Sequence, residues 1–175
     1  MSVRRIQMSS ADSIDKPCGY LGFSMGSSFY SLKRMHAYSA WAEVNFQDFA
    51  VLIGDWIYAY THSHFHGIAY KRSLRIATAM GDAATAMCEK VSKTRIRPLT
   101  VLRWRDLMAL KEYGSMFNAI AAEFKTNPDF RREACAQIHV NLGSKITRPG
   151  QDAITHTTTL HPLAKYLLHE LAGLI

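Results

Sequence analysis

Apolar and polar residues follow one another in blocks whose period changes along the chain. A short run at 18–24 (CGYLGFS) and a continuous apolar run at 48–54 (DFAVLIG) are typical of strands, and the second is expected to be buried on both faces. A third strand is expected at 96–102. Apolar residues at helical spacing predict helices at 31–44, 66–93, 104–125, 128–142 and 161–174. Candidate N-caps are Ser31, Asn127 and Thr159.

The alternation of strands with helices predicts an α/β fold, because a helix between two strands brings them into one parallel sheet. We therefore expect a single α/β domain over residues 18–175, with a parallel sheet flanked by helices, after a flexible polar arm at 1–17. Ligands of such sheets bind at the carboxyl ends of the strands. Ser24 stands at one of these ends.

The 175 residues carry a formal net charge of +7, with a sequence pI near 9.5. A surplus of positive charge favours a polyanionic partner such as nucleic acid. The three cysteines are far apart in the sequence, which indicates reduced thiols in a cytoplasmic protein. The polar start has no apolar signal core, and no apolar run reaches the roughly 18 residues that a membrane span needs.

Three histidines alternate in the segment THSHFHG at 61–67. In an extended strand, His62, His64 and His66 would lie on one side and could hold a metal ion. No nearby Asp, Glu or Cys completes a familiar set of ligands, so a polar loop leading into the next helix is the favoured interpretation. No metal is expected.

The residues GFSMG at 22–26 match the pattern G-x-S-x-G, in which a serine hydroxyl projects from a sharp turn after a strand. Such a turn suits a nucleophile, because backbone N–H groups beyond it can face a developing oxyanion. A small serine hydrolase is one interpretation, although in α/β hydrolases several strands precede the turn and here only 23 residues do. A plain strand-ending turn is another.

The longer segment GYLGFSMGSSFYS at 19–31 resembles the cyclodipeptide synthases, whose first strand ends in a glycine, a spacer, a nucleophilic serine and then an aromatic pair. Later segments are similar to that family in their order. They are a strand at DFAVLIGDW, a basic helix at YKRSLRIA, two further helices, and a helix with Tyr166 and Glu170 four residues apart. The resemblance covers residues 19–174. It implies a Rossmann-type fold similar to the catalytic domain of class I tyrosyl- and tryptophanyl-tRNA synthetases.

The resemblance also implies a reaction. Two aminoacyl-tRNAs, used in turn, would supply the amino acids of a cyclic dipeptide, with no cofactor. Ser24 would be the nucleophile and Gly22 the family's glycine. Tyr166 and Glu170, spaced to share one helix face, would hold the α-ammonium group, unless Tyr166 is a core residue and Glu170 a solvated one.

Further residues are candidates for binding. Tyr20 alternates with Gly22 and Ser24 along the strand, so it is either a wall of the side-chain pocket or a core aromatic residue. Ser27 stands where one branch of the family has Asn and another accepts other small residues. The candidate tRNA contacts, which could equally be a solvated surface, are Lys71, Arg72 and Arg75 on the predicted long helix.

The C-terminus departs from the family pattern. The family continues past the Tyr/Glu helix into a strand and a loop with a second tyrosine, proposed as a proton donor, whereas this sequence stops at Ile175. The chain is expected to be C-terminally shortened, or else to be a divergent member. A non-catalytic tRNA- or RNA-binding module on the same fold is therefore an alternative. The two amino acids and the oligomeric state stay open.

Overall fold

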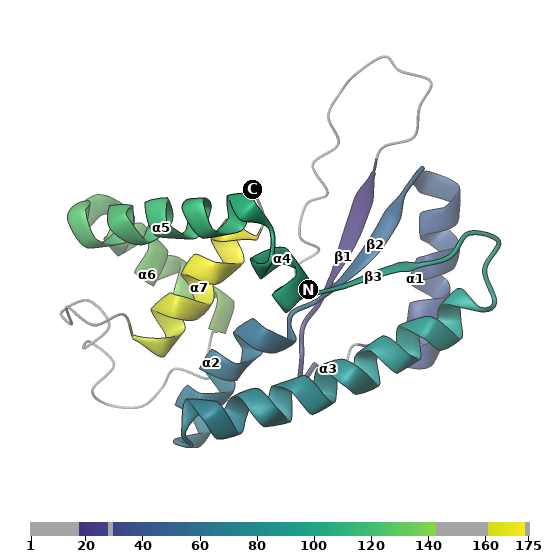
Figure 1. Cartoon of the computed structure of the whole chain (residues 1–175), viewed down its shortest axis with the longest axis horizontal. Coiled ribbons are helices and arrows are strands. Elements are labelled where there is room, and N and C mark those ends of the chain that lie inside the picture. Colours follow the sequence, from purple (N-terminus) through teal and green to yellow (C-terminus); the bar gives the residue numbers. More distant parts are fainter. Residues whose placement is uncertain (1–17, 28–29, 143–160, 174–175) are drawn as a thin grey trace, which may run out of the picture. The chain divides into compact units, whose positions relative to one another are not determined.

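The computed structural model describes residues 18–27, 30–142 and 161–173, which form an α/β fold of three strands and seven helices (Figure 1). The expected arm at 1–17 and the candidate cap Thr159 lie outside the described residues. The strands are β1 (Gly19–Phe23), β2 (Phe49–Ile53) and β3 (Thr100–Arg103). The helices are α1 (Leu32–Asn45), α2 (Asp55–His66), α3 (Tyr70–Ser92), α4 (Trp104–Met108), α5 (Lys111–Thr126), α6 (Pro128–Leu142) and α7 (Pro162–Ala172).

The sheet has the order β1-β2-β3, so strands that follow one another in sequence also lie side by side. β1 and β2 are parallel, with Gly19 opposite Phe49 and Phe23 opposite Ile53. Helix α1 connects these two strands, as a parallel pair requires. The predicted α/β fold with a parallel sheet flanked by helices is confirmed.

The described chain divides into two compact units. The first comprises residues up to Gly54 together with Met80–Leu102, and the second comprises Asp55–Ala79 and residues from Arg103 onward. The first unit thus holds β1, α1, β2, most of β3 and the later part of α3. The expectation of one catalytic domain over 18–175 stays a prediction.

The core of the first unit forms around the continuous apolar strand. Val51 and Ile53 in β2 are completely buried, as the run of apolar residues predicts. Ser31 caps α1, because its hydroxyl oxygen accepts a hydrogen bond from the N–H of Arg34 at 3.4 Å. The other core residues of this unit include Phe23, Met35, Ala42, Phe46, Cys88 and Val91.

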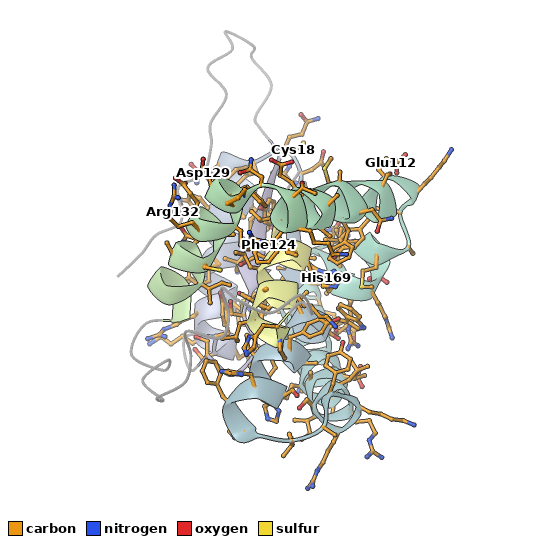
Figure 2. All side chains as sticks on the ribbon, turned by 90° about the vertical axis from the view of Figure 1, so that its left-hand side faces the viewer. Cys18, Glu112, Phe124, Asp129, Arg132 and His169 are labelled. Carbon is orange, nitrogen blue, oxygen red and sulfur yellow. The ribbon has the colours of Figure 1, made fainter. Side chains whose placement is uncertain are left out.

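Helix α7 lies at the centre of the second unit, where it contacts α2, α5 and α6 (Figure 1). Leu163 in α7 is completely buried in a cluster that also includes Phe124 of α5 (Figure 2). Helix α6 begins where the sequence predicts, because the side-chain oxygen of Asn127 accepts hydrogen bonds from the N–H groups of Asp129 and Phe130.

The histidine-rich segment is neither an extended strand nor a loop: it is the last part of α2. The buried residues of α2 include Ile57, Ala59 and Thr61, which alternate and so do not follow the period of a helix. Contacts with α7 stabilise a helix that the pattern alone does not indicate. Gly67, with φ of +62°, follows α2, and the helix predicted at 66–93 begins only at Tyr70.

Two further boundaries differ from the prediction. β3 spans Thr100–Arg103 instead of 96–102, because the guanidinium group of Arg97 is bound to the backbone carbonyls of Glu43 and Gln47 at 2.6 Å each. The helix predicted at 104–125 is two helices, α4 and α5. Leu110 separates them because its backbone is extended, with φ of −70° and ψ of 138°.

Two expectations drawn from composition can be compared with the structure. Cys18, Cys88 and Cys135 are not joined to one another by a disulfide bond in the structure. None of the helices in the described part of the chain has the length and apolar character needed to cross a membrane.

Candidate active site

Ser24 is exposed immediately after β1, where the chain turns at Met25 and Gly26. Met25 is buried and anchors the turn in the first unit. Gly26 has φ of +74°, a left-handed conformation that favours glycine. The register of the sheet puts Ser24 level with Gly54, whose N–H donates to the carbonyl oxygen of Phe23 at 3.1 Å. The G-x-S-x-G turn is therefore formed, and its serine stands at the carboxyl end of the sheet.

Tyr30 holds the chain that returns from this turn against β1. Its hydroxyl donates a 2.6 Å hydrogen bond to the carbonyl oxygen of Gly22, and its ring stacks on that of Phe23 with centroids 4.1 Å apart. Sequence reasoning placed an aromatic pair here but gave Tyr30 no role. The hydrogen bond fixes the backbone on the N-terminal side of Ser24.

Three residues near Ser24 were predicted to bind substrate, namely Tyr20, Gly22 and Ser27. Tyr20, Gly22 and Ser24 are exposed while Phe23 is buried, which agrees with the predicted alternation along the strand. Tyr20 is 54% exposed, so it is not the core aromatic residue that was the alternative. A Cβ atom added to Gly22 would meet nothing within 4 Å. Ser27 is also exposed. Their binding roles stay predictions.

Tyr166 and Glu170 lie on α7 in the second unit, one helical turn apart, so they share a face as predicted. Both are half-buried. Tyr166 packs against the hydrophobic cluster of this unit, so part of its side chain serves the core. Their predicted role in holding an ammonium group stays a prediction.

A buried histidine that sequence reasoning missed lies on the same helix. His169 is 6% exposed, and its Nδ1 is 2.9 Å from the hydroxyl oxygen of Tyr113 on α5. That oxygen also accepts a 3.1 Å hydrogen bond from the indole N–H of Trp104. Burial, with a smaller contribution from the charge of Lys165, lowers the pKa of His169 to about 4. His169 is thus neutral at pH 7.

A buried ion pair was also missed. Arg103, the last residue of β3, donates from Nε to Oδ2 of Asp55 at 2.9 Å, and its Nη2 contacts the same oxygen. The guanidinium group also donates to the backbone carbonyl of Thr78 at 3.1 Å. Asp55 begins α2 directly after Gly54, and a charged residue straight after an apolar strand was the available sequence signal.

The predicted tRNA contacts lie on the first turns of α3. Lys71, Arg72 and Arg75 are all exposed, so they can meet phosphate groups. Arg95 and Arg97, in the basic segment that follows α3, have different partners. The guanidinium group of Arg95 binds the carboxylate of Glu43 at 3.2 Å, and Arg97 binds backbone carbonyls.

Other side-chain chemistry adds little in the described part of the chain. No group of three His, Cys, Asp or Glu residues there could hold a metal ion. Burial raises the pKa of the Cys88 thiol to about 11, and burial also raises that of Cys135. These thiols stay protonated at neutral pH and are poor nucleophiles.

Comparisons with known proteins identify the family and the fold of the chain. The model of the cyclodipeptide synthase family matches residues 19–173. The chain belongs to the cyclodipeptide synthase family. A comparison with curated protein sequences found no significant match. The match covers the turn with Ser24 and the helix with Tyr166 and Glu170 alike.

Solved structures of cyclodipeptide synthases have the same fold. The enzyme from Fluoribacter dumoffii is 18% identical with a TM-score of 0.73, and the alignment covers 90% of this chain and 69% of that one. The Staphylococcus haemolyticus enzyme is 22% identical with a TM-score of 0.72, and the alignment covers 90% of this chain and 69% of that one. A protein from Mycobacterium tuberculosis is 16% identical with a TM-score of 0.72, and the alignment covers 89% of this chain and 65% of that one. Its structure is described as showing that these enzymes are related to type I tRNA synthetases.

Proposed function

We propose that this cyclodipeptide synthase family member joins two amino acids from aminoacyl-tRNAs through an ester on Ser24. The observation that carries the proposal is the exposed serine on a glycine turn at the carboxyl end of β1. An aminoacyl-tRNA already carries an activated ester, so no ATP is needed to form the peptide bond. The protein must supply a nucleophile and orient the reacting groups.

The proposed reaction has three steps. The Ser24 oxygen attacks the ester carbonyl of the first aminoacyl-tRNA, and the hydroxyl proton ends on the released ribose oxygen. The amine of this aminoacyl-enzyme then attacks the second aminoacyl-tRNA, giving a dipeptidyl-enzyme and a second free tRNA. The new terminal amine attacks the Ser24 ester, which closes the six-membered ring and returns a proton to the serine oxygen.

Other residues have supporting roles in the proposal. Glu170 and Tyr166 hold the α-ammonium group of the bound amino acid, for which a half-buried carboxylate beside a phenol is suited. Gly22 leaves space beside the serine, because nothing lies within 4 Å of a Cβ at that position. Tyr20 and Ser27, exposed on the same segment, contact the substrate. Lys71, Arg72 and Arg75 contact tRNA phosphates.

The test compares the native chain with Ser24→Ala, using a pool of charged tRNA and mass spectrometry of the products. We expect cyclic dipeptides from the native chain and an acid-stable increase in its mass by one aminoacyl group. Both should be lost in Ser24→Ala. Ser115→Ala is the matched control, because Ser115 is an exposed serine whose hydroxyl bonds only to nearby backbone in α5. It should behave like the native chain.

Two other outcomes would change the proposal. Undiminished product from Ser24→Ala would show that another group is the nucleophile. tRNA binding without product from the native chain would favour the second candidate function, a non-catalytic tRNA-binding module. That candidate is supported by the exposed cations Lys71, Arg72 and Arg75 on one end of α3.

A further inference from the structure

The imidazole of His169 contacts aromatic side chains of both α2 and α5. Figure 2 shows it on α7 among the side chains of neighbouring helices. Its ring is stacked on Phe117 of α5, with centroids 4.1 Å apart and planes 13° apart. It is also stacked on Tyr60 of α2 at 5.6 Å, and the ring of Trp56 meets it edge-on at 4.8 Å. Rings from two helices thus fix the plane of the imidazole.

Hydrogen bonds then fix the orientation of the imidazole within that plane. An indole N–H can only donate, so the Tyr113 oxygen is the acceptor of the 3.1 Å bond from Trp104. Tyr113 has one hydroxyl proton left to give. Nδ1 of His169 is its nearer acceptor at 2.9 Å, whereas the backbone oxygen of His169 is at 3.4 Å and already accepts from the N–H of Gly173. The proton therefore goes to Nδ1, and the ring carries its own proton on Nε2.

The protonation states of the neighbouring groups are consistent with this arrangement. Burial raises the pKa of the Tyr113 phenol, so the hydroxyl stays a donor. Burial also raises the pKa of Tyr60 on α2. Lys165, on the same helix as His169, is a nearby cation, and its charge disfavours protonation of the ring to the imidazolium form.

His169 lies on the buried side of α7, next to the half-buried face that carries the proposed ammonium-binding pair. Tyr166 precedes His169 by three residues and is its neighbour on the helix surface, whereas Glu170, the next residue along the chain, lies about 100° further round the helix. Gly173, one turn further, lies so close to the indole ring of Trp104 that an added Cβ would be 2.7 Å from it. The hydrogen bonds from Trp104 through Tyr113 to His169 therefore set the rotation of α7 about its axis. The close approach of Gly173 to Trp104 sets its position along that axis.

We propose that His169 is a positioning residue: as the neutral Nε2–H tautomer it accepts the Tyr113 hydroxyl proton and so holds Tyr166 and Glu170 in their working orientation. The tautomer and the hydrogen bond depend only on the structure of the second unit. The consequence for catalysis rests on the proposed function of Tyr166 and Glu170. The two parts are tested separately below.

The tautomer is tested by nitrogen NMR of protein labelled with ¹⁵N-histidine at pH 7. We expect one imidazole with a proton on Nε2 and a hydrogen-bonded, unprotonated Nδ1. It is assigned to His169 by its absence from the His169→Phe spectrum. In Tyr113→Phe, the Nδ1 signal should move toward that of a nitrogen without a hydrogen-bond donor. A proton on Nδ1 in the native chain, or a His169 signal that Tyr113→Phe leaves unchanged, overturns the proposal whether or not the chain makes cyclic dipeptides.

The consequence for catalysis is tested by steady-state kinetics of cyclic dipeptide formation. The rates are divided by the amount of enzyme that can be aminoacylated on Ser24. His169→Phe keeps a ring that can stack on Phe117 but has no acceptor. Because small displacements of orienting groups are costly, we expect kcat to fall about 10- to 100-fold. KM for the aminoacyl-tRNA should not change, since the proposed phosphate contacts lie on α3. His169→Asn, which offers an oxygen near the position of Nδ1, should recover part of the loss.

The controls distinguish positioning from loss of fold. His64→Phe makes the same substitution at a half-buried histidine of α2 and should leave both kinetic constants unchanged. Tyr113→Phe combined with His169→Phe should cost no more than the worse single variant, because both remove the same hydrogen bond. Unchanged kcat in His169→Phe, or additive losses in the double variant, overturns the positioning role. A native chain without cyclic dipeptide activity refutes the proposed function and leaves the tautomer result to be judged alone.

Discussion

Gly19 and Gly22 lie three positions apart on β1, but an added methyl group would meet different surroundings at each. A Cβ atom at Gly19 would be 2.6 Å from two ring carbons of Phe46. Phe46 is buried between the rings of Trp41 and Phe49, with centroids at 5.3 and 5.7 Å, so it has little room to move. At Gly22 nothing lies within 4 Å.

We therefore predict that Gly19→Ala lowers the free energy of unfolding by about 1–3 kcal/mol, through overpacking against Phe46. Gly22→Ala is the matched control for stability and should change it by less than about 0.5 kcal/mol. Urea unfolding of both variants measures the difference. Equal effects of the two substitutions would contradict the steric argument. Because Gly22 borders Ser24, its Ala variant should instead lose activity while staying folded.

Individual residues were predictable where the interaction is local in sequence. Ser31 and Asn127 cap their helices as expected, because a cap joins groups only two or three residues apart. Tyr20 shows the limit: alternation gave the face on which it lies, but its 54% exposure depends on what covers that face. The contact between Tyr113 and His169 joins residues 56 positions apart and had no sequence signal.

At the scale of elements, the helix α3 carries the cations proposed to contact tRNA. Lys71, Arg72 and Arg75 are exposed and lie within two turns of the helix. Each phosphate contact releases counterions, so binding through these residues must weaken with salt. Charge on this helix gives affinity without reading the base sequence.

We predict that replacing Lys71, Arg72 and Arg75 together by Ala weakens tRNA binding and makes its salt dependence shallower. The slope of log K against log salt should fall in magnitude by about 2–3, roughly one for each lost phosphate contact. Fluorescence anisotropy with labelled tRNA at several salt concentrations gives this slope. The matched control replaces the exposed cations Arg105, Lys111 and Lys125 of the second unit. An equal change in the control would mean that only net charge matters.

The loop between α3 and β3 shows why some basic residues are not available for nucleic acid. Glu43 of α1 accepts from the Arg95 guanidinium and from the N–H groups of Ile96 and Arg97. Loss of solvation by itself would raise the pKa of Glu43, but these hydrogen bonds and the charge of Arg95 outweigh it and lower the pKa. Cations that look alike in the sequence thus differ in role, because Arg95 and Arg97 hold this loop to α1.

At the scale of the whole molecule, the protein carries one buried and two half-buried histidines whose pKa values are lowered, so they resist protonation. Burial lowers the pKa of His169 to about 4, and burial also lowers the pKa values of His62 and His161. In the unfolded chain these groups titrate near pH 6.5. The unfolded state therefore binds more protons than the native state between about pH 6.5 and pH 4, and stability falls as the pH falls through this range.

For His169 alone, the loss between pH 7 and pH 5 should be about 2 kcal/mol of unfolding free energy. The measurement is urea unfolding at both pH values for the native chain and for His169→Phe, which has no group to titrate there. The variant should be less stable at pH 7 and should lose about 2 kcal/mol less on acidification. If both proteins show the same pH dependence, His169 is not held neutral by the fold.

The sequence by itself determined the fold class, the strands β1 and β2, most helices, the serine turn and the family. These features depend on hydrophobic period, turn residues and the order of motifs, all of which are local or sequential. Only the tertiary structure decided that THSHFH is helical, that 104–125 contains a break, and that Arg95 and Arg97 bind α1. It also decided the environment of His169, whose partners come from α2 and α5. Such contacts join distant segments, and their energies depend on burial and geometry that no local pattern contains.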